Sequence, residues 1–278
     1  MKDQDASAGT SLQRGFAIIR ALATTNGDGA KLTHIASATG LAQPTAHRIL
    51  RALTGEGVVE QDERSKAYRL SVEFFALAAR AGHRGNLRDI CRPILLRLSA
   101  SLGDTMFLLV RSGYDAMCLD RSEGPFPIRS FTGDIGGRVA LGVGQGALVI
   151  LAFLPEAERE EIIRFNLPRL LDLGLYDEVY LRTEIKRSLE LGYAASHGVG
   201  LLPGMAGIAV PVLDRQGRAV AALSVATLAE RLNADRLPTV VQILKKEAAS
   251  VGAQINPFDP VLRRPAQILG GLPIEAPK

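Results

Sequence analysis

The side chains best suited to binding chemistry in this 278-residue chain lie on one face of a predicted helix that begins near Pro44. Proline suits the first turn of a helix, where its missing N–H is harmless. Arg48 and Arg51 fall on one side of that helix, and Thr45 and His47 flank them near its start. The opposite side carries the apolar residues Ala46, Ile49, Leu50 and Leu53. Because a guanidinium can donate two parallel hydrogen bonds to guanine, the basic face is suited to the major groove of DNA.

A short helix and a tight turn come before this helix in the sequence. Thr33 is predicted to cap a helix over residues 34–39, and Gly40 is predicted to end it in the turn. A short helix, a glycine turn and a second helix follow the plan of a helix-turn-helix motif, and Gln43 directly precedes the predicted start of the second helix at Pro44. In such motifs the first turns of the second helix contact the base edges.

A charged hairpin follows the second helix. Residues 58–61 and 68–70 are predicted strands, and Arg64 and Lys66 lie in the turn between them, where they could reach backbone phosphates. The predicted DNA contacts are therefore Thr33, Gln43, Pro44, Thr45, His47, Arg48, Arg51, Arg64 and Lys66. The alternative is a small helical bundle whose arginines are only solvated, and His47 taken alone is typical of a solvated helix surface.

The composition is that of a globular chain, with 47% hydrophobic and 22% charged residues. Cys91 and Cys118 form no CxxC pair, so we expect neither a disulfide framework nor a zinc site, and we expect a reducing, cytoplasmic compartment. The polar N-terminus argues against a signal peptide, and the apolar, uncharged stretch of residues 139–154 is too short for a membrane span. The net charge of +4 permits a nucleic-acid partner without demanding one.

No motif in the chain predicts catalysis. Residues 142–147 fit GxGxxA, but no clear parallel strand precedes them, so we expect no nicotinamide cofactor. GxSxG, Walker and HExxH motifs are absent, the four histidines are scattered, and a pairing of Ser224 with His197 cannot be placed from sequence. We therefore predict no catalytic residue, no metal and no cofactor. The glycine-rich segment could present backbone N–H groups to an anion, or it could be a tight turn that only allows close packing.

Periodicity divides the remaining chain into two parts that separate near residue 85. Thr10 or Ser11 can cap a first helix that runs to about Thr24, and residues 71–85 and 87–102 are helical in spacing. Later predicted helices cover residues 146–154, 157–164, 178–191 and 237–255, and predicted strands cover residues 105–110, 116–121, 205–213 and 219–227. The predicted divisions are residues 1–85, 86–256 and a tail of 257–278.

Several segments resemble the IclR family of bacterial transcriptional regulators in order and spacing. They are SLQRGFAIIRAL, LTHIASATGLAQPTAHRILRALTGEGVVE, YRLSVEFFALAA, DRSEGPFPIRSFTGDIGGRVALGVGQGALVILAFLP and GIAVPVLDRQGRAVAALSVAT. The resemblance covers about residues 11–255. It implies a two-domain α+β chain: a winged helix-turn-helix domain, a linker helix used in dimerisation, and a C-terminal GAF-like α/β effector-binding domain.

The resemblance also implies a site for a small organic acid in the C-terminal domain. Matching the family's motif points to four residues on or near the last strands, His197, Gly207, Ser224 and Ala226. Ser224 keeps a hydroxyl, whereas Gly207 and Ala226 are smaller than the residues of some members, which favours a bulkier acid such as an aromatic one. The glycine-rich segment adds Gly142, Val143, Gly144 and Gly146, and Met106, Leu108 and Leu141 are candidate apolar lining.

The sequence therefore predicts a ligand-responsive regulator of a catabolic operon, without catalytic activity. Its expected partners are double-stranded operator DNA, a small organic acid and further copies of the chain, as a homodimer or a dimer of dimers. Helices 71–85 and 87–102 offer the pairing surface, and RNA polymerase is a further candidate partner. Two alternatives stay open: a sensor whose winged domain binds a protein, and a hydrolase that uses the C-terminal site.

Overall fold

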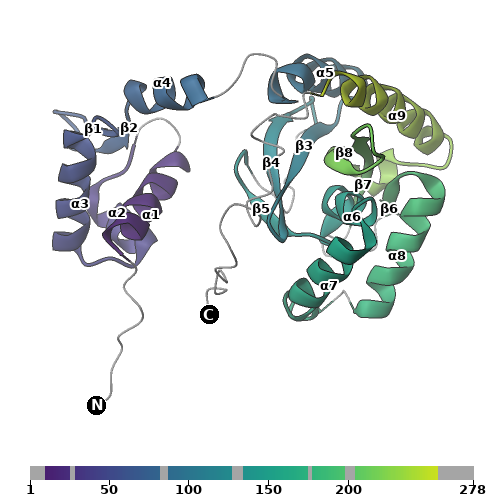
Figure 1. Cartoon of the computed structure of the whole chain (residues 1–278). Coiled ribbons are helices and arrows are strands. Elements are labelled where there is room, and N and C mark those ends of the chain that lie inside the picture. The colour runs from purple at the N-terminus through teal and green to yellow at the C-terminus, as the bar shows by residue number, and fades with distance from the viewer. Residues whose placement is uncertain are drawn as a thin grey trace. The chain divides into compact units, whose positions relative to one another are not determined.

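The computed structural model describes residues 10–25, 29–81, 87–126, 134–174, 177–197 and 204–255, and only the backbone of residues 78–81 and 197. The chain separates into two compact units, Met1–His83 and Arg84–Lys278, whose elements are labelled in Figure 1. The predicted tail, residues 257–278, lies outside the described residues.

Three helices form the centre of the first unit: α1 (Ser11–Ala23), α2 (Leu32–Thr39) and α3 (Gln43–Gly55). Thr10 begins α1 with a capping box, in which Gln13 N donates to the Thr10 hydroxyl (3.4 Å) and Thr10 N donates to Gln13 Oε1 (2.6 Å). The helices bury a shared apolar core that includes Ile18, Ile35 and Leu50. The sequence pattern predicted these three helices because each places its apolar residues on one face.

The start of α2 differs from the prediction. The helix begins at Leu32 after Lys31, which makes no side-chain cap, so the prediction that Thr33 caps it is wrong. Thr33 is instead an exposed residue of the first turn. Gly40 ends the helix as predicted, with a φ of 67° that favours glycine, and its N–H donates to the carbonyls of Ala36 and Ser37.

The wing of the first unit is the hairpin of β1 (Val59–Gln61) and β2 (Tyr68–Leu70), which pair antiparallel. After the hairpin comes α4 (Val72–Ala81), which Ser71 caps: the Ser71 hydroxyl accepts from Phe74 N (3.1 Å) and donates to the Gly57 carbonyl. The same serine therefore caps α4 and ties its start to the end of the helix-turn-helix segment.

The second unit is built on one six-stranded antiparallel sheet. In spatial order its strands are β5 (Arg138–Ala140), β4 (Asp115–Ser122), β3 (Thr105–Ser112), β8 (Ala219–Leu228), β7 (Met205–Leu213) and β6 (Ala194–His197). The inner strands β8 and β7 are almost entirely apolar, as expected for strands covered on both faces.

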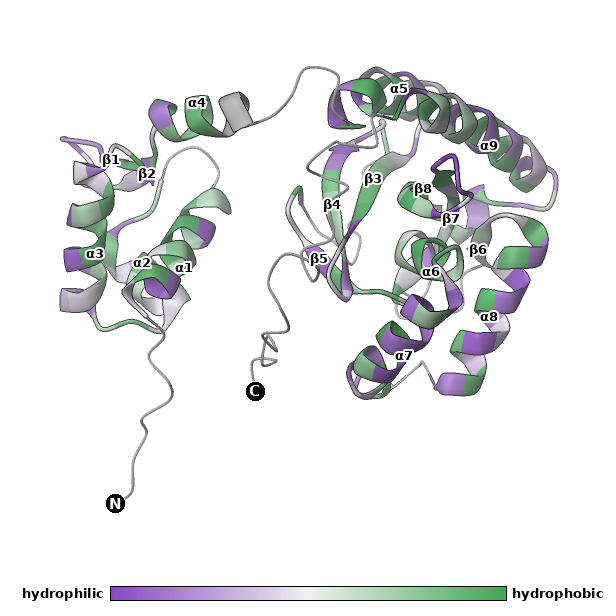
Figure 2. Cartoon of the chain, in the orientation of Figure 1, coloured by the Kyte–Doolittle hydropathy of each residue, from purple (hydrophilic) through white to green (hydrophobic). Residues whose placement is uncertain are grey.

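Helices cover both faces of this sheet (Figure 1). One face, which we call the α6 face, packs against α6 (Gly144–Ala152), α7 (Glu156–Leu171) and α8 (Glu178–Leu191). The other, the α5/α9 face, packs against α5 (Leu87–Leu102) and α9 (Arg236–Gln254). In Figure 2, α7 and α8 alternate hydrophobic and hydrophilic residues, as expected for helices with one solvent-facing side. By contrast, α6 is buried along most of its length.

A β-bulge in β4 changes which side chains face α5. The register shifts so that Leu109 pairs with Cys118 whereas Leu108 pairs with Asp120, which leaves Leu119 as the extra residue. Asp120 is thereby buried on the α5/α9 face, where its carboxylate pairs with Arg92 (Nη1–Oδ1, 3.0 Å) and Arg88 (Nε–Oδ2, 3.4 Å) of α5. These ion pairs fix the first turns of α5 to the sheet.

Candidate functional site

The basic face of α3 is free, as the spacing predicted. Ala46, Ile49 and Leu50 are buried in the core of the unit, and Leu53 is half-buried. On the other side the exposed residues are Gln43, Pro44, His47, Arg48 and Arg51, and Thr45 is half-buried. Within the described part of the chain, neither Arg48 nor Arg51 forms an ion pair. Both guanidinium groups are therefore available to an external acceptor.

The tip of the wing is held in one conformation by Asp62. Its Oδ1 accepts from the backbone N–H of Ser65 (2.7 Å) and Arg64 (3.1 Å) and from the Ser65 hydroxyl (2.8 Å). These bonds hold the pKa of Asp62 below its ordinary value, chiefly through the Ser65 N–H. Lys66 has a φ of 57°, which turns the chain, and Gln61 Nε2 donates to its carbonyl (3.1 Å). Arg64 and Lys66 are both exposed on this ordered turn.

The second candidate site lies on the α6 face of the large sheet, where small residues occupy neighbouring strands. Ala226 of β8 pairs with Gly207 of β7, and two residues away Ser224 pairs with Ala209. Ser224 is only 9% exposed, and within the described chain its hydroxyl has no hydrogen-bond partner. Gly207 and Ala226 are partly exposed although both lie on inner strands. The sheet is therefore incompletely covered at this point.

The start of α6 lies directly over these small residues. A Cβ added at Gly146 would lie 2.2 Å from Leu109 Cδ1 and 3.5 Å from Ser224 Cβ, so glycine permits the close approach of helix and sheet. A Cβ added at Gly207 would lie 3.3 Å from Cγ of Gln145. We call Gly146, Gly207, Ser224 and Ala226, together with Gln145, the small-residue site. The structure thus brings together four of the residues that the resemblance assigned to the effector.

The apolar lining predicted from the sequence is only partly consistent with this site. Met106 and Leu108 lie in the core on the α5/α9 face, so the prediction that they line the same site as Ser224 is wrong. Alternation along β3 shows which residues share a face, but it does not reveal which helices cover that face.

The other predicted residues of the glycine-rich segment lie outside the small-residue site. Leu141 and Val143 are buried in the core below α6. A Cβ at Gly142 would face Leu181 and Leu170 of the outer helices, away from the sheet. Gly144 opens α6 with a φ of 72°. The backbone of His197 pairs with Ala206 at the edge of the sheet, and its side chain lies outside the described residues.

The position of the glycine-rich segment is fixed by Asn166 of α7. This fully buried side chain donates from Nδ2 to the carbonyl oxygens of Tyr114 (2.7 Å) and Leu141 (3.2 Å), and its Oδ1 accepts from Arg169 Nη1 (2.9 Å). Arg169 continues the network to Asp115 of β4 (2.8 Å). Sequence reasoning missed Gln145, which lies between two glycines that it singled out for their backbone alone. It also missed Asn166, whose helical neighbours gave no sign that it was buried.

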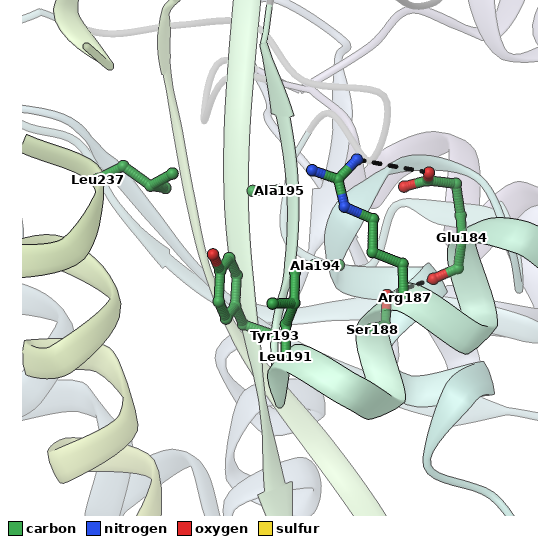
Figure 3. A pocket seen from close by; sticks show the side chains of 8 residues that line it. All are labelled: Glu184, Arg187, Ser188, Leu191, Tyr193, Ala194, Ala195 and Leu237. Carbon is green, nitrogen blue, oxygen red and sulfur yellow. Dashed lines mark hydrogen bonds and ion pairs between the residues drawn. The ribbon is translucent and has the colours of Figure 1, made fainter. Parts of the chain in front are cut away.

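Hollows also occur elsewhere in the described part of the chain. Figure 3 shows one between α8, β6 and α9, lined by Glu184, Arg187, Ser188, Leu191, Tyr193, Ala194, Ala195 and Leu237. Its volume of about 30 Å³ holds a few waters at most. A groove of about 400 Å³ between α7 and α8 carries Arg182, which is already paired with Glu160 (2.8 Å) and Glu178 (2.8 Å).

No metal-binding cluster of His, Cys, Asp or Glu occurs among the described residues. None of the helices in that part of the chain combines the length and apolar character of a membrane span. Cys91 and Cys118 are buried in separate cores on opposite faces of the sheet, and burial raises the pKa of each thiol to about 12. Neither thiol is therefore a nucleophile at neutral pH.

Comparison with known proteins agrees with this architecture. Residues 11–63 match the IclR helix-turn-helix domain, and residues 79–253 match the C-terminal domain of the bacterial transcriptional regulator IclR. The chain belongs to the IclR family of bacterial transcriptional regulators: it has a DNA-binding helix-turn-helix domain and a C-terminal effector-binding domain.

Similar proteins cover most of the chain. The HTH-type transcriptional regulator KipR of Bacillus subtilis is 29% identical over 228 residues, which are 81% of this chain and 89% of KipR. An IclR transcriptional regulator from Alicyclobacillus acidocaldarius has a similar structure, with a TM-score of 0.72 and 26% identity over 88% of this chain and 98% of that one. An IclR homologue from Microbacterium hydrocarbonoxydans, solved with 4-hydroxybenzoate, has the same TM-score at 23% identity, with the same shares of the two chains covered.

Proposed function

We propose that the chain controls transcription of a catabolic operon by binding operator DNA through α3 and the wing, and that a small organic acid at the small-residue site changes this binding. The observation that carries the proposal is the basic face of α3, where Arg48 and Arg51 are exposed and without ion pairs in the described chain. A buried core on the opposite side of the same helix leaves that face free for the major groove.

In this proposal the contacts divide into two kinds. Thr45, Arg48 and Arg51 meet base edges, and Gln43, Pro44 and His47 lie beside them at the start of α3. Arg64 and Lys66 on the wing, with Thr33 on α2, meet the phosphate backbone and set the register. Because Asp62 holds the wing tip in one conformation, less entropy is lost when the wing docks.

The effector is proposed to be a carboxylate with an apolar body. Ser224 offers an unpartnered hydroxyl in a nine-tenths buried position, and a buried hydroxyl without a partner gains most from a charged acceptor. In this proposal the body of the acid lies beside the small, partly exposed Ala226, since the stem of Gln145 already covers Gly207. The IclR homologue solved with 4-hydroxybenzoate is consistent with an aromatic acid of this kind.

The functional unit is proposed to be a dimer that reads a roughly palindromic site, alone or as a dimer of dimers. Three apolar side chains of α4 are strongly exposed: Val72 (77%), Phe75 (62%) and Leu77 (62%). Most apolar residues of α5 pack on its own sheet, so α4 rather than α5 supplies the pairing surface. Contact with RNA polymerase remains a prediction.

The experiment that tests the proposed function is a titration of fluorescently labelled DNA from upstream of this gene and its neighbours, followed by anisotropy at 50 to 200 mM KCl. We expect one fragment to bind with an affinity that falls steeply with salt, roughly 10³-fold or more over this range if at least six phosphates are contacted. A DNA of the same length from inside a coding region is the control. Equal, weak binding to every fragment would contradict the proposal.

A further inference from the structure

The polar groups around Gly207 suggest what else the effector must carry. Gln145 lies at the start of α6, and its Oε1 atom is buried without a hydrogen-bond partner. Its stem packs over Gly207, whose missing side chain leaves the space for it. A buried amide oxygen without a partner costs free energy, so its position calls for a donor from outside the described chain.

Ser196 supplies a second polar group at the same place. On β6 it pairs directly with Gly207, and it shares the α6 face because Ala194, two residues before it, packs in the core on that face. The Cα atoms of residues paired in this way lie about 4.5–5.5 Å apart. Ser196 is half-buried, and its hydroxyl has no hydrogen-bond partner in the described chain. Gln145 and Ser196 therefore both lie next to the bare backbone of Gly207 on the α6 face.

These groups are separate from Ser224, the proposed partner of the carboxylate. Gly207 pairs with Ala226, and Ser224 lies two residues further along β8. Diagonal neighbours of this kind are about 7 Å apart. The α6 face thus offers one hydroxyl at Ser224 and, beyond the partly exposed Ala226, a second pair of neutral polar groups, Gln145 of α6 and Ser196 of β6.

We infer that Gln145 and Ser196 form a second polar subsite, which selects acids that carry a neutral hydroxyl or amide group at the end remote from the carboxylate. The inference rests on the proposed effector site. A hydroxyl suits this subsite because it can donate to Gln145 Oε1 and accept from Ser196 at the same time. A second carboxylate has no proton to donate to Gln145 Oε1, so it would leave this buried oxygen without a partner.

Matched pairs of acids test the inference, because the members of each pair differ only at the remote end. The probes are 4-hydroxybenzoate with 4-methylbenzoate, and 4-hydroxybutanoate with pentanoate. Binding to the full chain is measured by calorimetric titration. In the wild type we expect the hydroxy acid of at least one pair to bind about 3- to 10-fold tighter than its methyl partner, as one or two added hydrogen bonds allow.

The variants Gln145→Leu and Ser196→Ala should remove this preference. We expect the affinity for the hydroxy acid to fall to that of the methyl acid, while the methyl acid binds within about 2-fold of its wild-type affinity. Gln242→Leu, a substitution of an exposed glutamine in α9, is the matched control and should leave all affinities unchanged.

Two results would overturn the inference in distinguishable ways. If the acids bind but the wild type does not discriminate within either pair, or if both variants weaken the two acids of a pair equally, the second subsite does not exist and the proposed effector site stands. If none of the four acids binds, the proposed effector class is wrong and the subsite falls with it.

Discussion

At the scale of single residues, the DNA-binding proposal depends most on Arg48. Replacing it with alanine should cost about 1–3 kcal/mol of operator binding and relax the base preference at one position, because a bidentate base contact is lost. Anisotropy titrations with the operator and with its single-base variants measure both effects. Arg20→Ala removes an exposed arginine from the end of α1 and serves as the control for net charge. Unchanged affinity in Arg48→Ala would place the groove-reading residues elsewhere.

Ser224 and Ala226 test the proposed carboxylate site. Ser224→Ala should reduce the free energy of binding of the acid by roughly 1.5–3 kcal/mol, since one hydrogen bond to a charged group is lost. Ala226→Leu should exclude bulkier acids by filling the partly exposed position beside Gly207. Neither change should alter DNA binding in the absence of the acid. Calorimetric titration measures the affinities, and wild-type binding in both variants would show that the acid binds at another site.

The two buried cysteines predict a loss of stability at alkaline pH. Each thiol has a pKa raised from 9.0 to about 12 by burial, so the folded state holds its protons more tightly than the unfolded state. The stability that they contribute is complete below pH 9 and is lost progressively as the pH rises from 9 towards 12. Thermal unfolding at pH 8 to 11 should therefore show a decline that is shallower in Cys91→Ala and Cys118→Ala. Equal slopes in all three proteins would contradict the burial argument.

At the scale of elements, α4 should carry the dimer. No other element of the first unit covers its exposed Phe75 and Leu77, and large exposed apolar side chains in neighbouring positions are typical of an interface. Replacing both with glutamate should shift the molar mass measured by light scattering at micromolar concentration from at least a dimer to the monomer. Val179→Glu, which changes an exposed apolar residue of α8, is the control. A monomeric wild type would contradict the prediction.

The elements also show how far the sequence could predict the structure. Helical periodicity predicted α3, α5 and α8 closely, because each buries one regular apolar face. The three-residue strand β5 and the strand β6, with its small and polar side chains, were missed because neither carries an apolar alternation. The bulge at Leu119 could not be predicted either. It changes which residues of β4 point to each face of the sheet, and no local sequence pattern marks that change.

The candidate site shows the same division between local and non-local information. The spacing of α3 was enough to separate Arg48 and Arg51 from the core, because one helix decides which residues share a face. Two features depend instead on which helix packs over which strand. One is the core to which Met106 and Leu108 belong, and the other is the contact of Gln145 with Gly207. Such contacts join residues far apart in the chain, so no local pattern encodes them.

At the scale of the whole molecule, the proposed effector site and the proposed DNA-binding face lie in separate compact units. An acid that regulates transcription must therefore bind the DNA-competent and the DNA-free states with different affinities. Linkage also requires the reverse effect: operator DNA must change the affinity for the acid by the same factor. Ser224→Ala should lower the affinity for the acid and leave the factor by which DNA changes that affinity unaltered.

The most direct test of the regulator as a whole is the operator affinity measured by anisotropy with and without a saturating concentration of the acid found by titration. We predict that the acid changes the dissociation constant of the protein–DNA complex by about 5- to 150-fold, the range of typical allosteric coupling. The same dissociation constant in both titrations, with the acid shown to be bound, would contradict ligand-responsive control of DNA binding.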